Sequence, residues 1–165
     1  MFHIVLVEPE IPQNAGNIAR TCAATGCVLH MVRPLGFEVS DKYLKRAGLD
    51  YWQYLNVKIW ENTEEFFAAN SGATFYFFTT KGRKRHIDAH FREGDFLVFG
   101  KETKGLPEDL LKAHPESCLR IPMIGDLRSL NLSNSVAIAV YEGLRQADFK
   151  GFNLEGQLHT MRWED

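Results

Sequence analysis

The most chemically varied part of the chain is the stretch from residue 121 to residue 142. Polar side chains that donate or accept hydrogen bonds crowd its first half: Asp126, Arg128, Ser129, Asn131, Ser133 and Asn134. An apolar run, residues 136–140, follows and predicts a helix that is buried on most sides, with Ser133 or Asn134 as its N-cap. A polar loop that enters a buried helix can bind a ligand, although a capped core helix explains the same pattern.

A second set of polar side chains follows the first apolar segment of the chain. Residues 2–7 are apolar and β-branched and predict a buried strand. Two prolines are expected to exclude regular structure from residues 8–14, and a helix is predicted over residues 15–25, ending at Gly26. We expect Asn14 and Arg20 to lie near the start of this helix, with Asn14 close to its cap. Ligands bind at the carboxyl ends of parallel strands, so both residues are candidates for a binding site.

The densest positive run of the chain, residues 81–86, permits two interpretations. It is either a solvated loop or a phosphate-binding segment, because lysine and arginine neutralise a nucleic-acid backbone. No aromatic residue interrupts the run, so base stacking by this loop is not indicated. The cations that we assign to a possible RNA-binding face are Lys81, Arg83, Lys84, Arg85, Lys45, Arg46 and Arg128.

Familiar patterns for nucleotide binding, hydrolysis and metal binding are missing from the sequence. No Gly-x-Gly-x-x-Gly follows the first predicted strand and no P-loop occurs, which disfavours an unrelated nucleotide-binding enzyme. Gly100 and Gly105 follow a late strand and permit close approach of a ligand, but two glycines are weak signals. The six histidines do not cluster, and the three cysteines lack metal-ligand spacing, so we expect no metal and buried free thiols.

Composition describes an ordinary globular chain. The 165 residues suffice for one domain with a sizeable core, and no apolar run approaches the roughly 20 residues of a membrane span. The first residues lack the features of a signal peptide, so we expect a cytoplasmic protein that does not cross a membrane. The net charge of −2 argues against a surface coated in basic charge but not against a local basic face.

Predicted strands and helices alternate along the chain, which indicates an α/β fold with a mostly parallel sheet flanked by helices. The further strands are expected over residues 27–32, 56–60, 73–80, 95–99 and 117–121. The further helices are expected over residues 40–47, 63–70 and 108–113, with Pro107 at the first position of the last. We expect residues 1–149 to form one domain and residues 150–165, which show little periodicity, to form a tail.

Three segments in this order resemble the sequence motifs of the SPOUT-class RNA methyltransferases. They are residues 9–20 (PEIPQNAGNIAR), 99–107 (FGKETKGLP) and 121–135 (IPMIGDLRSLNLSNS), and residues 44–51 also fit between the first two. The nearest likeness is to the small single-domain subfamily that methylates the ribose 2′-hydroxyl of the tRNA wobble nucleotide, cytidine or uridine 34. The resemblance covers about residues 2–149.

The resemblance implies a deep trefoil knot at the carboxyl end, in which the last helix is threaded through a loop. It also implies an S-adenosylmethionine cofactor, a homodimer with Tyr141 on the interface helix, and the tRNA anticodon stem-loop as partner. The cofactor is expected to contact Phe78, Thr79, Gly100, Glu102, Gly105, Ile121, Met123, Ser129, Leu130 and Ser135. Phe78 stands where the family pattern leads us to expect leucine, which is a change that preserves polarity.

The resemblance further implies an in-line displacement in which the ribose 2′-oxygen attacks the methyl carbon. Arg20 matches the motif arginine that is proposed as general base, although guanidinium groups keep their proton at neutral pH and suit orientation of the hydroxyl and phosphate better. Asn14, Ser129 and Asn131 complete the expected catalytic set, and Glu102 is expected to hold the knot loop. Methylation of another tRNA position or of ribosomal RNA, and RNA binding without catalysis, remain open alternatives.

Overall fold

The computed structural model describes residues 1–39, 54–125 and 127–163. The predicted helix over residues 40–47, with Lys45 and Arg46, and the segment over residues 44–51 lie outside the described residues.

Within the described residues, seven strands form one sheet in the order β3-β2-β1-β6-β4-β7-β5. All named strand pairs are parallel, which confirms the predicted parallel α/β architecture. The strands are β1 (His3–Val7), β2 (Val28–Val32), β3 (Val57–Trp60), β4 (Phe75–Phe78), β5 (Lys84–Arg85), β6 (Phe96–Phe99) and β7 (Cys118–Arg120). The α-helices are α1 (Pro12–Thr25), α3 (Thr63–Ala69), α4 (Glu108–Ala113) and α5 (Leu132–Gln146), and short 3₁₀ helices span His86–Asp88 and Pro115–Ser117.

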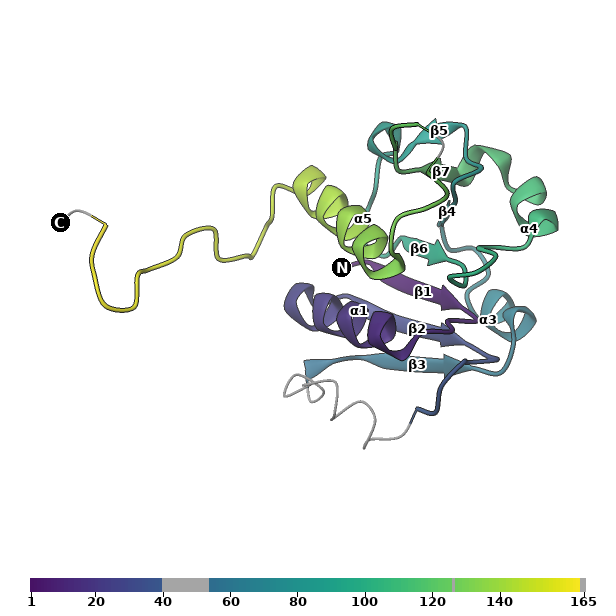
Figure 1. Ribbon diagram of the computed structural model, residues 1–165, viewed down its shortest axis with the longest axis horizontal. Helices are drawn as coiled ribbons and strands as arrows, with labels where there is room; N and C mark the ends of the chain where they lie inside the picture. The colour runs from purple at the N-terminus through teal and green to yellow at the C-terminus, as the bar shows by residue number, and fades with distance from the viewer. Residues whose placement is uncertain (40–53, 126, 164–165) are drawn as a thin grey trace.

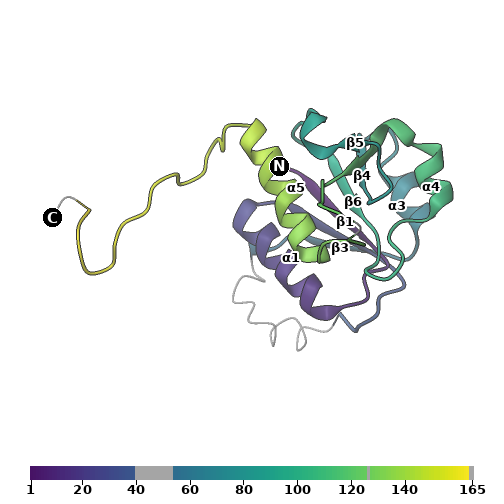
Figure 2. The same cartoon turned by 45° about the horizontal axis from the view of Figure 1, so that its top comes forward.

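The sheet is covered on both faces, because successive side chains of a strand point to opposite sides. Ile4 and Leu6 of β1 pack with Ile18 of α1 and Val140 of α5 in one core cluster. Val5 and Val7 belong to a second cluster that includes Phe66 of α3 and residues of α4. Figures 1 and 2 show α1 and α5 side by side on one face of the sheet and α3 on the other. The central strands β1 and β6 are therefore nearly continuous apolar runs, as strands buried on both faces are.

Apart from shifts of one or two residues at the ends of other elements, the structure differs from the sequence prediction at the start of α1 and in a strand that was missed. Helix α1 begins at Pro12, three residues earlier than expected, because proline fits the first turn of a helix, where its missing N–H has no partner to lose. The run predicted as loop contains β5, since Lys84 and Arg85 pair with β7 and form the edge strand of the sheet. Gly26 ends α1 in the left-handed conformation, with φ 70°, as predicted.

Helix α5 is less buried than its apolar run suggested. Val136, Ala139 and Val140 are buried, but Ile138 is 38% exposed and Tyr141 is 49% exposed. The expectation that this helix is buried on most sides is therefore wrong for the single chain, in which one face packs on the core and the other meets solvent.

Cys22, Cys27 and Cys118 are buried free thiols, as expected, and burial raises the pKa of each. Residues 153–163 are exposed and extend away from the body (Figure 1). Among the described helices, none is long and apolar enough to cross a membrane.

Candidate functional site

A cavity of about 520 Å³ lies at the carboxyl ends of the central strands. Its floor includes Phe78 at the end of β4 and Phe99 at the end of β6, whose rings stack 4.7 Å apart. The loop of residues 100–105, the loop leading into α5 and the start of α1 form its walls. The volume suits a small organic ligand, and the location is the usual one for ligands in parallel α/β proteins.

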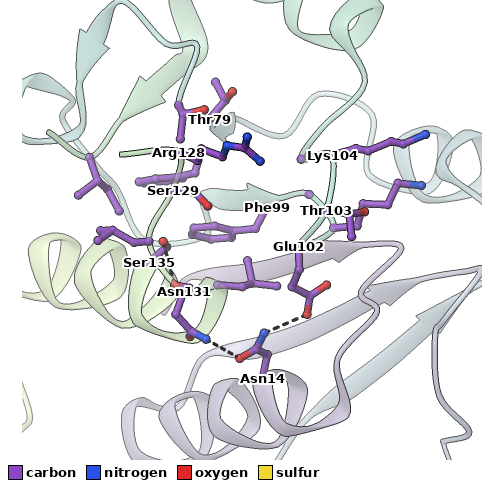
Figure 3. A pocket seen from close by; sticks show the side chains of 18 of the residues that line it. Asn14, Thr79, Phe99, Glu102, Thr103, Lys104, Arg128, Ser129, Asn131 and Ser135 are labelled. Atoms are coloured by element: carbon purple, nitrogen blue, oxygen red, sulfur yellow. Dashed lines mark hydrogen bonds between the residues drawn. The ribbon is translucent and has the colours of Figure 1, made fainter. Parts of the chain in front are cut away.

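All ten residues predicted to contact a cofactor line this one cavity. Figure 3 labels four of them, Thr79, Glu102, Ser129 and Ser135. Apolar side chains of Ile121, Met123 and Leu130 supply a slot, and the hydroxyls of Ser129 and Ser135 add polar groups. The other predicted members are Phe78, Thr79, Gly100, Glu102 and Gly105. An apolar slot with a few polar contacts suits the adenosine part of S-adenosylmethionine, so the lining fits the expected cofactor.

The loop after β6 folds back on itself so tightly that Gly100 has no room for a side chain. A Cβ added there would lie 2.1 Å from the carbonyl carbon of Gly105. The loop is closed by a 2.8 Å hydrogen bond from the amide of Gly105 to the carbonyl of Lys101. Gly100 is therefore required by the close approach of backbone to backbone, which the glycine pattern alone did not reveal.

A hydrogen-bonded chain of three side chains joins the three motif segments (Figure 3). The Asn14 amide nitrogen donates to Glu102 over 3.1 Å, and the Asn14 amide oxygen accepts from Asn131 over 3.0 Å. The side-chain oxygen of Asn131 accepts from the backbone amides of Ser133 and Asn134. Both ends of the Asn14 side chain are thus engaged within the protein.

Two predicted helix caps are wrong. Asn131, not Ser133 or Asn134, is the N-cap of α5, and the Ser133 hydroxyl instead donates to Asn131 over 2.6 Å. Asn14 does not cap α1, because the early start at Pro12 places it inside the first turn.

Glu102 supplies the cap that α1 lacks in its own sequence. Its carboxylate accepts from the backbone amides of Glu10 and Ile11, at 2.8 and 3.1 Å. In return the Glu10 carboxylate accepts from the amide and hydroxyl of Thr103. A carboxylate at a helix N-terminus is favoured by the helix dipole, so these bonds tie the first motif to the second.

Arg20 lies outside the cavity. It is exposed in the middle of α1 and does not contribute to the lining, which corrects the expectation that it sits near the helix start. Only Asn14, Ser129 and Asn131 of the four predicted catalytic residues line the cavity.

The predicted RNA-binding cations divide into paired and unpaired groups. Lys81 and Arg128 line the cavity, whereas Arg83, Lys84 and Arg85 do not. Lys81 lies 2.7 Å from Glu108, whose pKa it lowers, and Arg85 forms two hydrogen bonds with Asp88. Within the described residues, Arg83 and Arg128 form no ion pair with a carboxylate, so they remain available to a phosphate. Lys84 forms no ion pair there either, although its charge helps to lower the pKa of Asp88.

Sequence reasoning missed several lining residues in the second motif. Lys101, Thr103 and Lys104 line the cavity between the two glycines that the sequence had singled out. Their position inside a glycine-bounded loop was the available signal. In the described part of the chain, no group of three His, Cys, Asp or Glu side chains is arranged to hold a metal ion.

Comparison with known proteins gives one consistent family. The model of the SpoU rRNA Methylase family matches residues 1–141. A relative from Methylovorus glucosotrophus, named tRNA (cytidine(34)-2′-O)-methyltransferase, is 55% identical over 152 residues, which cover 92% of this chain and 99% of that protein.

Two solved structures are also similar over nearly the whole chain. A Bacillus anthracis protein is 50% identical with a TM-score of 0.89, covering 94% of this chain and all of the other. A structure described in terms of the 2-OH methylation of C/U34 on tRNA is 49% identical with a TM-score of 0.85, covering 91% and 98% of the two chains.

Proposed function

The chain belongs to the SpoU rRNA methylase family, and from this premise we propose that it methylates the ribose 2′-hydroxyl of cytidine or uridine 34, the wobble nucleotide of tRNA, using S-adenosylmethionine. The observation that carries this proposal is the near-complete alignment with relatives that are named for that reaction. The cavity supports it, because the three aligned motifs converge there.

S-adenosylmethionine bound in this cavity would supply an activated methyl group. Ile121, Met123 and Leu130 would line the adenine, while the backbone around Gly100 and Gly105 approaches closely. Ser129 makes no hydrogen bond within the described residues, so its hydroxyl is available to a bound molecule. These residues hold the donor in one orientation, which is the main requirement when the methyl group is already reactive.

Arg20 is proposed to orient the substrate. Its guanidinium keeps its proton at neutral pH and can form a fork with the ribose hydroxyl and the neighbouring phosphate. Asn14 and Asn131 are proposed to act indirectly, because their amides hold the loops around the cavity together. The proton acceptor is the one role that we assign to no side chain.

We further propose that the chain forms a homodimer through α5. Ile138 and Tyr141 are three residues apart on this helix and both are exposed, so they present one apolar face. An exposed apolar face on a core helix is typical of a protein–protein contact. Each cofactor cavity would then lie close to the partner, because α5 also begins at the cavity wall.

The knot, the domain bounds, the RNA element and the cellular location are proposed from membership of the family. Helix α5 follows β7 in the chain and packs beside α1 (Figure 2). We propose that this part of the chain forms the deep trefoil knot of the family. Residues 1–149 form the methyltransferase domain and residues 150–165 the tail. The substrate is tRNA recognised at its anticodon stem-loop, which places the enzyme in the cytoplasm.

Labelled S-adenosylmethionine and unmodified bulk tRNA provide the test of the reaction. Label on a ribose 2′-oxygen at position 34, mapped by nuclease digestion, is the expected result. Label at another tRNA position, or only on ribosomal RNA, would keep the family and overturn the proposed target. Failure to bind the cofactor would contradict the proposed reaction.

A further inference from the structure

A second cavity, of about 500 Å³, adjoins the cofactor cavity. The two cavities share Lys81, Lys101, Lys104 and Gly105, so the loop that closes the first also borders the second. Figure 3 shows Lys104 extending away from Ser129 and Asn131, which lie across the first cavity. A ligand in the second cavity would therefore sit beside the methyl donor rather than in its place.

The lining of the second cavity carries one more lysine than glutamate. Lys101 lies 2.6 Å from Glu8, and Lys81 lies 2.7 Å from Glu108. Lys104 is exposed and has no ion pair within the described residues, so the lining carries a surplus of one positive charge. A bound anion with a single negative charge would neutralise that surplus.

Glu8 is held in place to pair with Lys101. Its φ of 52° lies in the left-handed region, which is unfavourable for a residue with a side chain. The amide of Glu8 donates to the carbonyl of Val32 over 2.9 Å, and the carboxylate meets Lys101. Lys101 is thus fixed by its partner, which leaves Lys104 as the cation that can respond to a ligand.

Bare backbone also faces open space in this region. A Cβ added at Gly105, where φ is 69°, would meet no atom within 4 Å. A ligand can therefore approach the main chain of the loop directly beside Lys104.

We infer that the second cavity binds one backbone phosphodiester of the RNA next to the target nucleotide, with Lys104 as its principal ligand. The inference rests on the proposed function, which makes RNA the substrate. A phosphodiester carries one negative charge, which matches the surplus, and lysine binds phosphate as a compact point charge. Because the two cavities adjoin, this contact positions the ribose against the methyl donor.

Steady-state kinetics on an anticodon stem-loop RNA test the role of Lys104. With saturating S-adenosylmethionine, Lys104→Ala is expected to raise the KM for RNA about tenfold with little change in kcat, as loss of one charged contact does. The slope of log affinity against log salt should fall by about 0.7 to 1. Lys104→Arg should restore most of the affinity, and Lys112→Ala, an exposed lysine of α4 outside both cavities, is the matched control.

Stem-loops with one neutral methylphosphonate linkage at successive positions identify the phosphate. One linkage near the target nucleotide should weaken wild-type binding, and in Lys104→Ala the same linkage should cause no further loss. An unchanged KM for Lys104→Ala, or equal losses at every linkage in both proteins, would overturn the inference. A weaker affinity for the cofactor with an unchanged KM for RNA would assign the charge to the cofactor carboxylate and also overturn it.

The wild-type protein separates this inference from the proposed function. If the wild type methylates the stem-loop and Lys104→Ala methylates it with the same kinetics, only the phosphate site is contradicted. A wild-type protein that neither binds nor methylates the stem-loop contradicts the proposed function and the phosphate site together.

Discussion

Asn14 joins segments that are far apart in the sequence through the two ends of one amide. Its partners, Glu102 and Asn131, lie 88 and 117 residues away along the chain. One N–H of the Asn14 amide and one lone pair of its oxygen are engaged in these two bonds, so the side chain ties the loops together. At the scale of single residues, the site therefore contains side chains that hold the cavity as well as side chains that face into it.

Arg20 belongs to neither kind, because it lies outside the cavity, and its removal is the first prediction. Arg20→Ala should lower kcat for methyl transfer by about a hundredfold or more, since positioned groups at a reacting hydroxyl contribute that much. The affinity for S-adenosylmethionine, measured by calorimetry, should be unchanged because Arg20 lies outside the cavity. Asn17→Ala, an exposed residue of the same helix, is the control. Normal turnover by Arg20→Ala would remove this residue from the mechanism.

Asn131 belongs to the first kind, and its prediction concerns stability. Asn131→Ala removes the N-cap of α5 and a partner of Asn14, so the free energy of unfolding should fall by about 1–2 kcal/mol. Asn134→Ala, whose exposed side chain makes no hydrogen bond within the described residues, should change it by less than about 0.5 kcal/mol. Urea unfolding measures both. Equal stability of the two variants would show that the chain of amides does not hold the loops.

The residues that line the cavity at the strand ends were largely predictable, whereas their connections were not. The motifs are contiguous segments, so each carries its lining residues together into the cavity. The cap of α1 is different, because Glu102 lies 91 residues from Ile11 and no local rule can identify it. Local capping rules instead favoured Asn14 and Ser133, and both choices were wrong.

At the scale of elements, a row of aromatic side chains crosses three parallel strands on the face opposite α1. Tryptophan can only donate, so the Trp60 indole, 3.1 Å from His30 Nδ1, leaves the His30 proton on Nε2. That proton points at His3 Nδ1, 2.8 Å away. Burial, with additional effects of His3 and Lys58, lowers the pKa of His30 to about 3.

The buried His30 predicts acid sensitivity. In the unfolded chain its pKa is about 6.5, so between that pH and about 3 the unfolded state binds the extra proton. The free energy of unfolding is therefore unaffected by His30 above pH 6.5. Below that pH it falls, by up to about 1.4 kcal/mol per pH unit, because the unfolded chain takes up a proton that the folded protein does not. His30→Gln should flatten the pH dependence of urea unfolding, while His159→Gln in the exposed tail should not. Parallel profiles for wild type and His30→Gln would contradict this assignment.

Elements with strong periodicity were predicted well, and the failures have physical causes. Strands β1, β2 and β6 are apolar runs that pack on both faces, so composition alone located them. Strand β5 was missed because its two exposed residues, Lys84 and Arg85, carry no apolar signal and pair only at the sheet edge. The start of α1 was misplaced because Pro12 breaks helices in most positions but not in the first turn.

At the scale of the whole molecule, the exposed face of α5 is the feature that the single chain leaves unexplained. The apolar run predicted a helix buried on most sides, but in the chain alone one side remains exposed. Association of two copies through α5 would bury Ile138 and Tyr141. The helix would then be buried on most sides, as its apolar run predicted. A knot and a dimer depend on the path and pairing of whole elements, which hydrophobic periodicity does not encode.

The proposed dimer yields the fourth prediction. Ile138→Asp should convert the protein to a monomer in light scattering after size exclusion, because a buried unpaired charge is strongly unfavourable in an interface. Leu158→Asp is the matched control, since Leu158 is also 38% exposed but lies in the tail. A wild-type monomer, or a dimer that survives Ile138→Asp, would contradict the proposed interface.

The ribose 2′-hydroxyl of nucleotide 34 is the atom group on which the whole account depends. The most direct measurement compares methyl transfer to a tRNA anticodon stem-loop with transfer to the same RNA in which only that hydroxyl is replaced by hydrogen. A third RNA, with the replacement two nucleotides away, controls for the loss of a hydroxyl as such. We predict full transfer to the first and third RNAs and none to the second. Undiminished transfer to the RNA that lacks the hydroxyl at position 34 would contradict the account.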